Sequence, residues 1–283
     1  MKPCLVTLAL LALTVPTSPV IAGPLQVVER STARVQTEER FSFRVDLYSS
    51  AQSLQGFIAM RGIQGDIDIP FNEIAEKMNF GLIVGTEIRY RRWGFLIDMA
   101  YADLRGRVLR LSSAHRRPLI DNFDTVYNKD ADYEQRQLVS NVVLSYRFVD
   151  SSLIALEGYA GVRLNFLAAE STQYGQFVAY GEPPFPVVKL EVESSQRWID
   201  PVVGARFQTA VGGRVFVRAA GDIGGFGVGS DFTWQASGLI GVNVTRNFSL
   251  SLGYCGIGID YTNGGFRYDA IAHGPLFGAE LRF

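Results

Sequence analysis

Cysteine, histidine and an excess of charge of either sign are all scarce in this sequence. Two cysteines and two histidines occur in 283 residues, and 27 lysines and arginines face 28 aspartates and glutamates. The balanced charge argues against a general nucleic-acid-binding protein, which would normally be basic. Only His115 and His273 could serve as the histidine of a hydrolase, and His273 has Asp269 but no serine close by in the sequence. We expect no catalytic residue, no metal and no cofactor.

Long apolar runs are also missing, apart from one at the N-terminus. Residues 5–15 are mostly apolar and follow Lys2, but a membrane helix needs about 20 such residues. Two prolines interrupt the segment, and small or short residues at 20–22 precede Gly23. This pattern predicts a secretory signal peptide over 1–22 that is cleaved before Gly23.

Removal of the predicted signal peptide determines how many cysteines remain for a disulfide. Cys4 would be removed with the signal peptide, which leaves Cys255 as the only cysteine of the mature chain. A single cysteine forms no internal disulfide, so the stability of the exported protein has to come from its fold.

Glycine and aromatic residues are abundant, and most of the chain after residue 40 alternates between apolar and polar residues. In 154–166, IALEGYAGVRLNF, one face carries Val162 and Leu164 and the other carries Glu157 and Arg163. Side chains of a strand point alternately to its two faces, so this segment is a strand with an apolar and a charged side. Similar patterns predict ten strands, at 41–61, 79–91, 93–109, 133–149, 153–170, 194–210, 213–225, 231–245, 248–261 and 268–283.

The strand count is open near the start of the chain. Residues 41–61 form either one bent strand or a hairpin that turns at Ser49-Ser50. A hairpin would need a further strand at 26–34 to keep the number even, which would give twelve strands, and eight is open as well. The helical spacing of Pro70–Met78 predicts a short helix in the first long loop.

The connections between the predicted strands alternate in length. Turns of a few residues follow some strands, whereas long links occupy 111–131 and 171–193. Short periplasmic turns and long extracellular loops are typical of an outer-membrane barrel. A soluble β-sandwich or lipocalin-like barrel could alternate in the same way, but strands of roughly 13–18 residues exceed the usual length of about 5–6.

Aromatic residues cluster near predicted strand ends on the apolar face, as in the girdles at membrane interfaces. They are Tyr90, Trp93, Tyr146, Phe148, Trp234 and Phe248. The last segment is amphipathic, with Phe277, Leu281 and Phe283 on one face, and it resembles the signal that outer-membrane assembly machinery recognises. We predict an all-β fold, a transmembrane antiparallel up-and-down β-barrel over 40–283 in the outer membrane of a Gram-negative bacterium, after a short periplasmic segment at 23–39.

The second half carries a resemblance to a known group. WIDPVVGARF (198–207) and GDIGGFGVGSDFTWQASGLIGVNVTRNFSLSLGY (221–254) resemble Gram-negative outer-membrane β-barrel proteins related to the OmpA-like and porin-like small barrels. NFGLIVGTEIRYRRWGFLIDMAYADL (79–104) fits less specifically. The resemblance implies the fold and the location but no activity. Cys255 departs from it, because the matching place in the pattern looks like an arginine, so a lumen charge would be missing here.

If the apolar face contacts lipid, the charged face lines the lumen. The lumen would then hold Glu87, Arg89, Asp98, Arg147, Glu157, Arg163, Asp200, Arg206, Arg218, Asp222, Glu280 and Arg282. A single antiparallel register of the strands at 153–170 and 194–210 opposes Arg163 to Asp200 and Glu157 to Arg206. Because buried charges must be paired, we predict both ion pairs inside the barrel. A barrel of about ten strands filled in this way has a largely closed lumen rather than a wide pore.

Basic residues gather where the third predicted strand would leave the membrane on the long-loop side. They are Arg105, Arg107, Arg110, His115, Arg116 and Arg117. Arginine suits phosphate geometrically, so the run predicts contact with lipopolysaccharide, and a solvated loop is the alternative. The acids that follow, Asp121, Asp124, Asp130, Asp132 and Glu134, match no metal-loop spacing and indicate a plain acidic loop, with calcium left open. The glycines at 224–229 precede a strand, which predicts a tight hairpin rather than a phosphate loop.

The predicted role is that of an integral outer-membrane barrel with a structural or surface-interaction function. The segment PPFPVVKLEVESS (183–195) could pair with a strand of a partner. A narrow porin-like channel for small solutes is the alternative, and a lipid-modifying enzyme is the third. The expected partners are outer-membrane lipid, lipopolysaccharide and the barrel assembly machinery; we expect no nucleic acid, and we favour a monomer.

Overall fold

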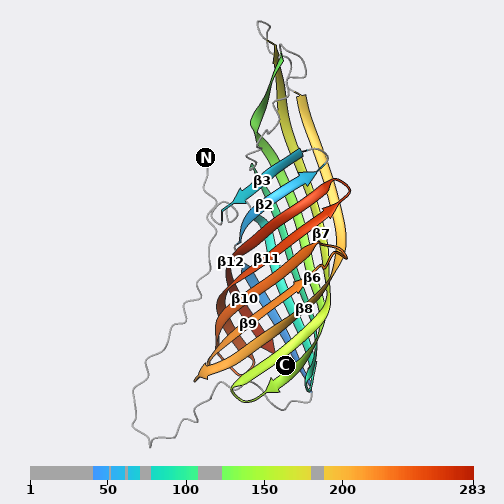
Figure 1. Ribbon diagram of the computed structural model, residues 1–283. Helices are drawn as coiled ribbons and strands as arrows, with labels where there is room; N and C mark the ends of the chain where they lie inside the picture. The colour runs from blue at the N-terminus through green and yellow to red at the C-terminus, as the bar shows by residue number, and fades with distance from the viewer. Residues whose placement is uncertain (1–40, 51, 61–62, 71–77, 108–122, 180–187) are drawn as a thin grey trace, which may run out of the picture. The chain divides into compact units, whose positions relative to one another are not determined.

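The described residues form twelve β-strands (Figure 1). The computed structural model describes residues 41–50, 52–60, 63–70, 78–107, 123–179 and 188–283. The strands are β1 (Phe41–Ser50), β2 (Ser53–Met60), β3 (Ile63–Ile69), β4 (Met78–Tyr90), β5 (Trp93–Arg107), β6 (Phe123–Asp150), β7 (Ile154–Ala179), β8 (Val188–Gly212), β9 (Val215–Gly224), β10 (Phe232–Asn243), β11 (Phe248–Asn263) and β12 (Phe266–Arg282). The predicted signal peptide, the predicted segment at 23–39 and nearly all of the predicted helix at 70–78 lie outside the described residues. No α-helix of membrane-spanning length and hydropathy occurs in the described part of the chain.

Ten of the strands close into an antiparallel barrel, and β2 and β3 form an added hairpin. Strand β1 closes the ring, because it pairs with β4 on one side and with β12 on the other. The last residue takes part in the closure: Phe283 and Phe43 exchange two backbone hydrogen bonds of 2.8 and 3.1 Å. The predicted all-β barrel of about ten strands is therefore confirmed.

The segment at 41–61 is one bent strand that follows β12. Strand β1 pairs with residues 276–282 of β12, and β2 continues along the same partner from His273 to Arg267. The chain turns back only after Met60, as β3, whose one strand partner among the described residues is β2. The alternative of a hairpin at Ser49-Ser50 is therefore wrong, because both halves run in the same direction against one partner.

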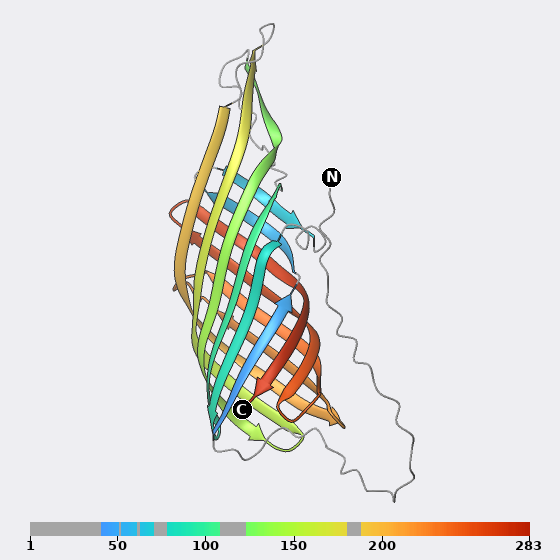
Figure 2. The ribbon, with the colours of Figure 1, turned by 180° about the vertical axis from the view of Figure 1, so that it is seen from behind.

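Three neighbouring strands are much longer than the rest. β6, β7 and β8 have 28, 26 and 25 residues, whereas β9 and β10 have 10 and 12. Figures 1 and 2 show these three strands projecting beyond the others at one end. We call residues 123–137, 168–179 and 188–198 of these strands the tall wall.

The tall wall corrects the predicted loops at 111–131 and 171–193. Residues 123–131, 171–179 and 188–193 lie in strands, and the pairing of β6 with β7 extends to Phe123 and Ala179. On β6 and β7 the sequence pattern stops earlier because both faces of the extensions are largely polar, whereas residues 188–193 of β8 (VKLEVE) alternate and could have been assigned to the strand. Apolar–polar alternation marks a strand only where one of its faces is apolar.

The outer face of the barrel carries an apolar belt. On β7, Leu156 and Leu164 are each 40 % exposed, whereas Glu157 and Arg163 between them are buried. Farther along the same strand the outward residues become polar, and Glu170 forms an exposed ion pair with Arg136 of β6. The predicted orientation, with apolar residues outside and charges inside, is therefore confirmed.

Aromatic rings line the belt at the end of the barrel that has the short turns. Trp93 and Tyr146 lie 4.9 Å apart between ring centroids, and Tyr146 and Phe148 lie 5.4 Å apart. Phe43 and Phe283 meet at 5.9 Å across the closing seam. These contacts form an aromatic girdle of the kind predicted for a membrane interface.

Candidate functional site

The lumen is filled in two layers, and the one nearer the short turns is a network of ion pairs. Glu87 and Glu157 are 3–4 % exposed and lie at its centre. Arg89 contacts both, at 2.5 Å to Glu157, and the Nη1 atom of Arg206 lies 3.1 Å from Glu87 and 3.2 Å from Glu157. Arg44 also pairs with Glu87. We call this network, with the Arg218–Glu280 pair beside it, the charged layer.

The Arg218–Glu280 pair extends the charged layer to the closing strands. The Nη2 atom of Arg218 lies 2.8 Å from a carboxylate oxygen of Glu280, and Arg44 approaches the same carboxylate at 4.0 Å. Arg282 pairs with Glu280 as well and donates to Asn243 at 3.0 Å. Each of these arginines therefore meets a carboxylate, which offsets the cost of burying its charge.

The predicted register of β7 and β8 is confirmed, but one ion pair has a different partner. Glu157 lies opposite Arg206 and forms the predicted pair, and Arg163 lies opposite Asp200. The guanidinium of Arg163 instead reaches Asp222, with Nη2 at 2.6 Å from Oδ1. It also donates to Asn141, Thr233 and Gln235.

Asp200 is satisfied by its own neighbours. Its carboxylate accepts hydrogen bonds from the backbone N–H of Ser230 at 2.6 Å and from the indole N–H of Trp198 at 3.1 Å. The amide of Asn165 adds a bond of 2.8 Å. The short aspartate side chain stays beside β8, whereas the long arginine crosses the lumen, so opposition in register does not decide which groups pair.

The turn that holds Asp200 is the predicted glycine hairpin. Gly225 and Gly227 have φ values of 86° and 74°, which glycine adopts without strain, and Phe226 between them has a φ of 51°. The turn joins β9 to β10, as predicted, and it brings Ser230 onto Asp200.

The second layer fills the lumen at the end away from the short turns and is apolar. Its buried members are Leu54, Ile58, Ile69, Leu167, Ala169, Val192, Trp198, Ile259, Tyr261, Phe266, Tyr268 and Ala270. Trp198 and Tyr261 stack at 3.9 Å between ring centroids with an interplanar angle of 12°. We call these residues the apolar layer. The prediction of a lumen full of charges missed it, although Ile257, Ile259 and Tyr261 form an apolar face opposite Gly258 and Asp260 in the sequence.

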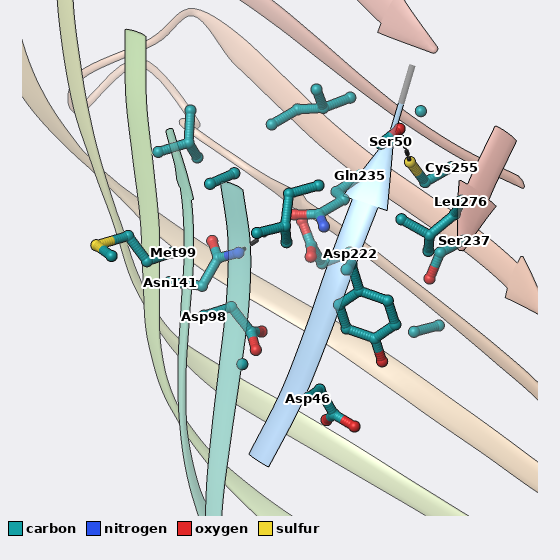
Figure 3. A pocket seen from close by; sticks show the side chains of 18 of the residues that line it. Asp46, Ser50, Asp98, Met99, Asn141, Asp222, Gln235, Ser237, Cys255 and Leu276 are labelled. Carbon is teal, nitrogen blue, oxygen red and sulfur yellow. Dashed lines mark hydrogen bonds between the residues drawn. The ribbon is translucent and has the colours of Figure 1, made fainter. Parts of the chain in front are cut away.

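A cavity of about 260 Å³ lies in the lumen and is lined by residues of eleven of the twelve described strands. Figure 3 shows Asp98 and Asn141 on one side of it and Ser237, Cys255 and Leu276 on the other. Asp46 and Asp222 also line it. The predicted lumen residue Asp98 therefore borders open space rather than the ion pairs of the charged layer.

Two acids of the cavity flank a glycine in one cross-strand row. Asp46 of β1 lies opposite Gly85 of β4, which lies opposite Asp98 of β5. A Cβ atom at Gly85 would lie 2.8 Å from Oδ1 of Asp98 and 3.7 Å from Oδ2 of Asp46. Both carboxylates therefore project over the space that a side chain would otherwise fill.

Cys255 lies on the lumen side, as its place in the pattern implies. Its thiol is free and lies 3.2 Å from the amide nitrogen of Gln52 and 3.8 Å from the hydroxyl of Ser50. The position therefore borders the cavity with a small, weakly polar group.

The predicted lipopolysaccharide site stays a prediction. Arg105 and Arg107 end β5, with their backbones opposite Glu134 and Asp132 of β6. Arg110, Arg116 and Arg117 lie outside the described residues, as does His115. Of the predicted acidic loop, Asp124, Asp130, Asp132 and Glu134 lie in strand β6 and Asp121 lies outside the described residues. Among the described residues no cluster of three metal-ligating side chains occurs.

His273 has a different partner from the one its sequence neighbourhood indicates. Its Nδ1 atom lies 2.5 Å from the hydroxyl of Tyr254, which is exposed on the outer face. Asp269 pairs with Arg267 instead, at 3.2 Å. Ser53 of β2 lies directly opposite His273, but no hydrogen bond between these two side chains occurs among the described residues, and the lack of catalysis stays a prediction.

No family model matches the sequence, and no curated protein matches it. Solved structures with a similar fold include the outer membrane protease OmpT from Escherichia coli, at 9 % identity and a TM-score of 0.46, over 86 % of this chain and 97 % of that one. Neisserial surface protein A matches at 12 % identity and a TM-score of 0.31, over 87 % and 98 %. The attachment invasion locus protein Ail of Yersinia pestis matches at 11 % identity and 0.34, over 87 % and 100 %. These likenesses concern the fold alone, and the OmpA-like and porin-like grouping stays a prediction.

Proposed function

We propose that this protein is an integral outer-membrane β-barrel with a closed lumen that acts by presenting its tall wall to a partner outside the membrane. The observation that carries the proposal is the length of β6, β7 and β8, which run past the apolar belt and carry exposed polar residues there, such as Arg136 and Glu193. A membrane anchor alone needs no such extension.

The apolar belt and the girdle support the membrane location. Side chains such as Leu144, Leu164 and Ile240 are 40–52 % exposed on the outer face and would contact lipid. The charged residues of the same strands face inward and are paired, which is the arrangement a barrel needs in a bilayer. The short turns would then face the periplasm and the tall wall the cell exterior.

The two lumen layers favour a closed barrel over the alternative of a narrow channel. The charged layer blocks the short-turn end with ion pairs, and the apolar layer blocks the other end with stacked rings. A water-filled path would have to cross both. The third alternative, a lipid-modifying enzyme, would need a serine hydrogen-bonded to His273, but the Nδ1 atom of His273 contacts Tyr254 rather than Ser53, which lies opposite it on β2.

Within the tall wall, β8 has an open edge. Strand β9 pairs with β8 only from Val202 to Gly212, whereas β7 pairs with it up to Val188. Residues 188–198 therefore have one strand partner among the described residues. An extended segment of a partner could add to this edge by backbone hydrogen bonds, which is a common mode of peptide recognition. This takes up the predicted pairing of 183–195 in the part that the structure describes.

The backbone geometry shows which residues a partner would meet. The carbonyl of Pro201 accepts from Gly225 on the β9 side, at 3.1 Å. Because the register of β7 and β8 is unbroken, alternate residues such as Glu193 and Ser195 direct their N–H and C=O groups to the same side. Glu191 and Glu193 are exposed there and would favour a basic partner.

The closed lumen is tested by single-channel conductance of the refolded protein in a planar bilayer. We expect no openings once insertion has been confirmed, because both layers are intact. Steady, reproducible openings would overturn the closed lumen and make small-solute permeation the function.

The open edge is tested with a display library of short random peptides on the immobilised refolded protein. Peptides that bind through the edge should lose binding to Ser195→Pro, which removes a backbone donor on the open side. The matched variant Ser195→Ala keeps that donor and should bind normally. Equal binding to both variants would place the interaction elsewhere.

A further inference from the structure

We propose that the lumen cavity binds a small amphipathic cation, such as a primary alkylammonium, which enters through the barrel wall beside β4. This proposal goes beyond the proposed function, which does not use the cavity. Its tests are independent of those of the tall wall.

The first step is the pair of carboxylates over Gly85. Asp46 and Asp98 approach the same empty volume from two strands, and no side chain separates them. Two carboxylates over a shared space repel each other unless a cation or a proton lies between them. The site therefore has the charge that would attract a positive group.

The second step is that the chain does not neutralise these acids fully. Asp46 is 6 % exposed; its Oδ2 atom pairs with Arg44 at 3.1 Å, but its Oδ1 atom is buried without a hydrogen-bond partner. No hydrogen bond or ion pair of Asp98 occurs among the described residues, and it lines the cavity. Three arginines line the cavity as well, and each is shared with a carboxylate of the charged layer: Arg44 also meets Glu87, Arg206 meets Glu87 and Glu157, and Arg218 meets Glu280. A buried carboxylate oxygen without a donor is costly, so a ligand donor at this place would be favoured.

The third step is the composition of the cavity, which selects the class of cation. Leu54, Leu239, Ile257 and Leu276 line the part away from the acids and offer an apolar surface. The described residues hold no cluster of three metal ligands, so a bare metal ion would lack partners. An ammonium group has three donors and no acceptor, which suits two carboxylates, and a short alkyl tail suits the leucines.

The fourth step is the position of the opening. Leu82 and Met99 are 36 % and 40 % exposed on the apolar outer face, and both also line the cavity. The pairing of β1 with β4 ends at Tyr48 and Ile83, while β4 continues to Met78. The chain beyond β1 follows β12 as β2 and leaves that edge of β4 without a neighbour among the described residues. The cavity therefore reaches the outer face beside β4, where lipid would lie.

The direct test is calorimetric titration of the refolded full-length protein in detergent micelles with n-hexylammonium, against n-hexanol and n-hexanoate as matched probes. Heats from empty micelles are subtracted, because all three probes partition into detergent. We expect n-hexylammonium to bind at least about tenfold more tightly than the other two, since it alone pairs with the carboxylates. Equal binding of the ammonium and the alcohol, or no binding of any probe, would overturn the proposal.

Two substitutions locate the site. Asp98→Asn removes one carboxylate without breaking an ion pair, so the barrel should fold and n-hexylammonium should bind about tenfold more weakly. Asp231→Asn, at an exposed position outside the cavity, is the matched control and should bind as the wild type does. Gly85→Ala places a methyl group between the carboxylates and should weaken binding as well. Unchanged binding in Asp98→Asn, with an unchanged unfolding midpoint, would refute the assignment.

Cys255 offers an independent measurement, because its thiol borders the cavity. Cys255 is labelled with a cationic and with an anionic methanethiosulfonate. Each labelling rate is divided by the rate at which the same reagent reacts with free glutathione, which corrects for intrinsic reactivity. The variant Cys255→Ser gives the background. We expect the cationic reagent to react faster, n-hexylammonium to slow it, and Asp98→Asn to reduce the preference. A normalised preference for the anionic reagent, or none, would mean that the cavity does not attract cations.

Discussion

The two halves of the lumen are closed by opposite kinds of side chain. In the charged layer, Arg89 and Arg206 each meet both Glu87 and Glu157, and every contact is an ion pair. In the apolar layer, Trp198 stacks on Tyr261, and aliphatic residues of β2, β7 and β12 pack around them. The same barrel wall therefore encloses two interiors that respond differently to mutation.

The difference shows what each layer contributes. A buried ion pair adds little net stability compared with apolar residues of the same volume, but removing one partner leaves an uncompensated charge. Apolar packing stabilises in proportion to the area buried and to the absence of voids. The charged layer should therefore tolerate only changes that keep the charges matched, and the apolar layer should tolerate changes that keep the volume.

The largest effect is expected from Glu87→Ala in the charged layer. Arg44, Arg89 and Arg206 would lose a shared carboxylate, which should lower the free energy of unfolding by roughly 3–5 kcal/mol. Urea unfolding in lipid vesicles, followed by tryptophan fluorescence, measures the change. A loss below about 1 kcal/mol, as for a surface pair, would mean that water solvates this layer.

A smaller loss is expected from Leu167→Ala in the apolar layer. Leu167 is 1 % exposed, so the substitution should leave a cavity and lower the free energy of unfolding by about 2–3 kcal/mol. Leu167→Met conserves volume and should cost less than about 1.5 kcal/mol in the same urea assay. If both variants lower the free energy of unfolding by the same amount, the shape of the side chain rather than its volume would determine the stability of this layer.

Trp198→Phe tests the polar contacts that the apolar layer makes with Asp200 and Ser230. The substitution keeps an aromatic ring against Tyr261 but removes the indole N–H that donates to Asp200 and to Ser230 at 2.8 Å. We expect a loss of about 1–2 kcal/mol in thermal or urea unfolding, because Asp200 keeps its other donors. A neutral result would assign the role of Trp198 to packing alone.

The smallest effect is expected from Glu170→Ala in the tall wall. Glu170 pairs with Arg136 at 3.5 Å, and both side chains are about half exposed. Exposed pairs of this kind contribute less than about 1 kcal/mol and are screened by salt. Unfolding at low and high salt should therefore show a small difference at most. A loss comparable to that of Glu87→Ala would show that the tall wall is not solvated as its exposure indicates.

The sequence could predict the register of β7 and β8, because a single offset opposes Arg163 to Asp200 and Glu157 to Arg206. It could not predict that Arg163 pairs with Asp222. That choice depends on how far an arginine reaches across the lumen and on the turn that already satisfies Asp200. Local periodicity carries no information on either.

The apolar layer and the cavity were missed for related reasons. Inward residues such as Leu167 are no more apolar than their outward neighbours, here Phe166 and Ala168, so they do not stand out in an alternating pattern. The cavity depends on the alignment of Gly85 with Asp46 and Asp98, and these residues come from three strands. The sequence leaves open whether 41–61 is one bent strand or a hairpin, and only the pairing of β2 with β12 shows the bend and the open edge that it leaves on β4.

The backbone bonds between Phe43 and Phe283 also have a consequence for folding. They join the first and last parts of the barrel, so the contact that completes the wall has the greatest separation along the chain. Contacts of this kind carry the highest entropic cost of closure and form slowly. During translocation, β1 emerges early and must keep an unpaired edge until β12 has followed, which exposes it to wrong partners. A chain cut short before β12 would therefore not make a smaller barrel; it would remain an open sheet with two reactive edges.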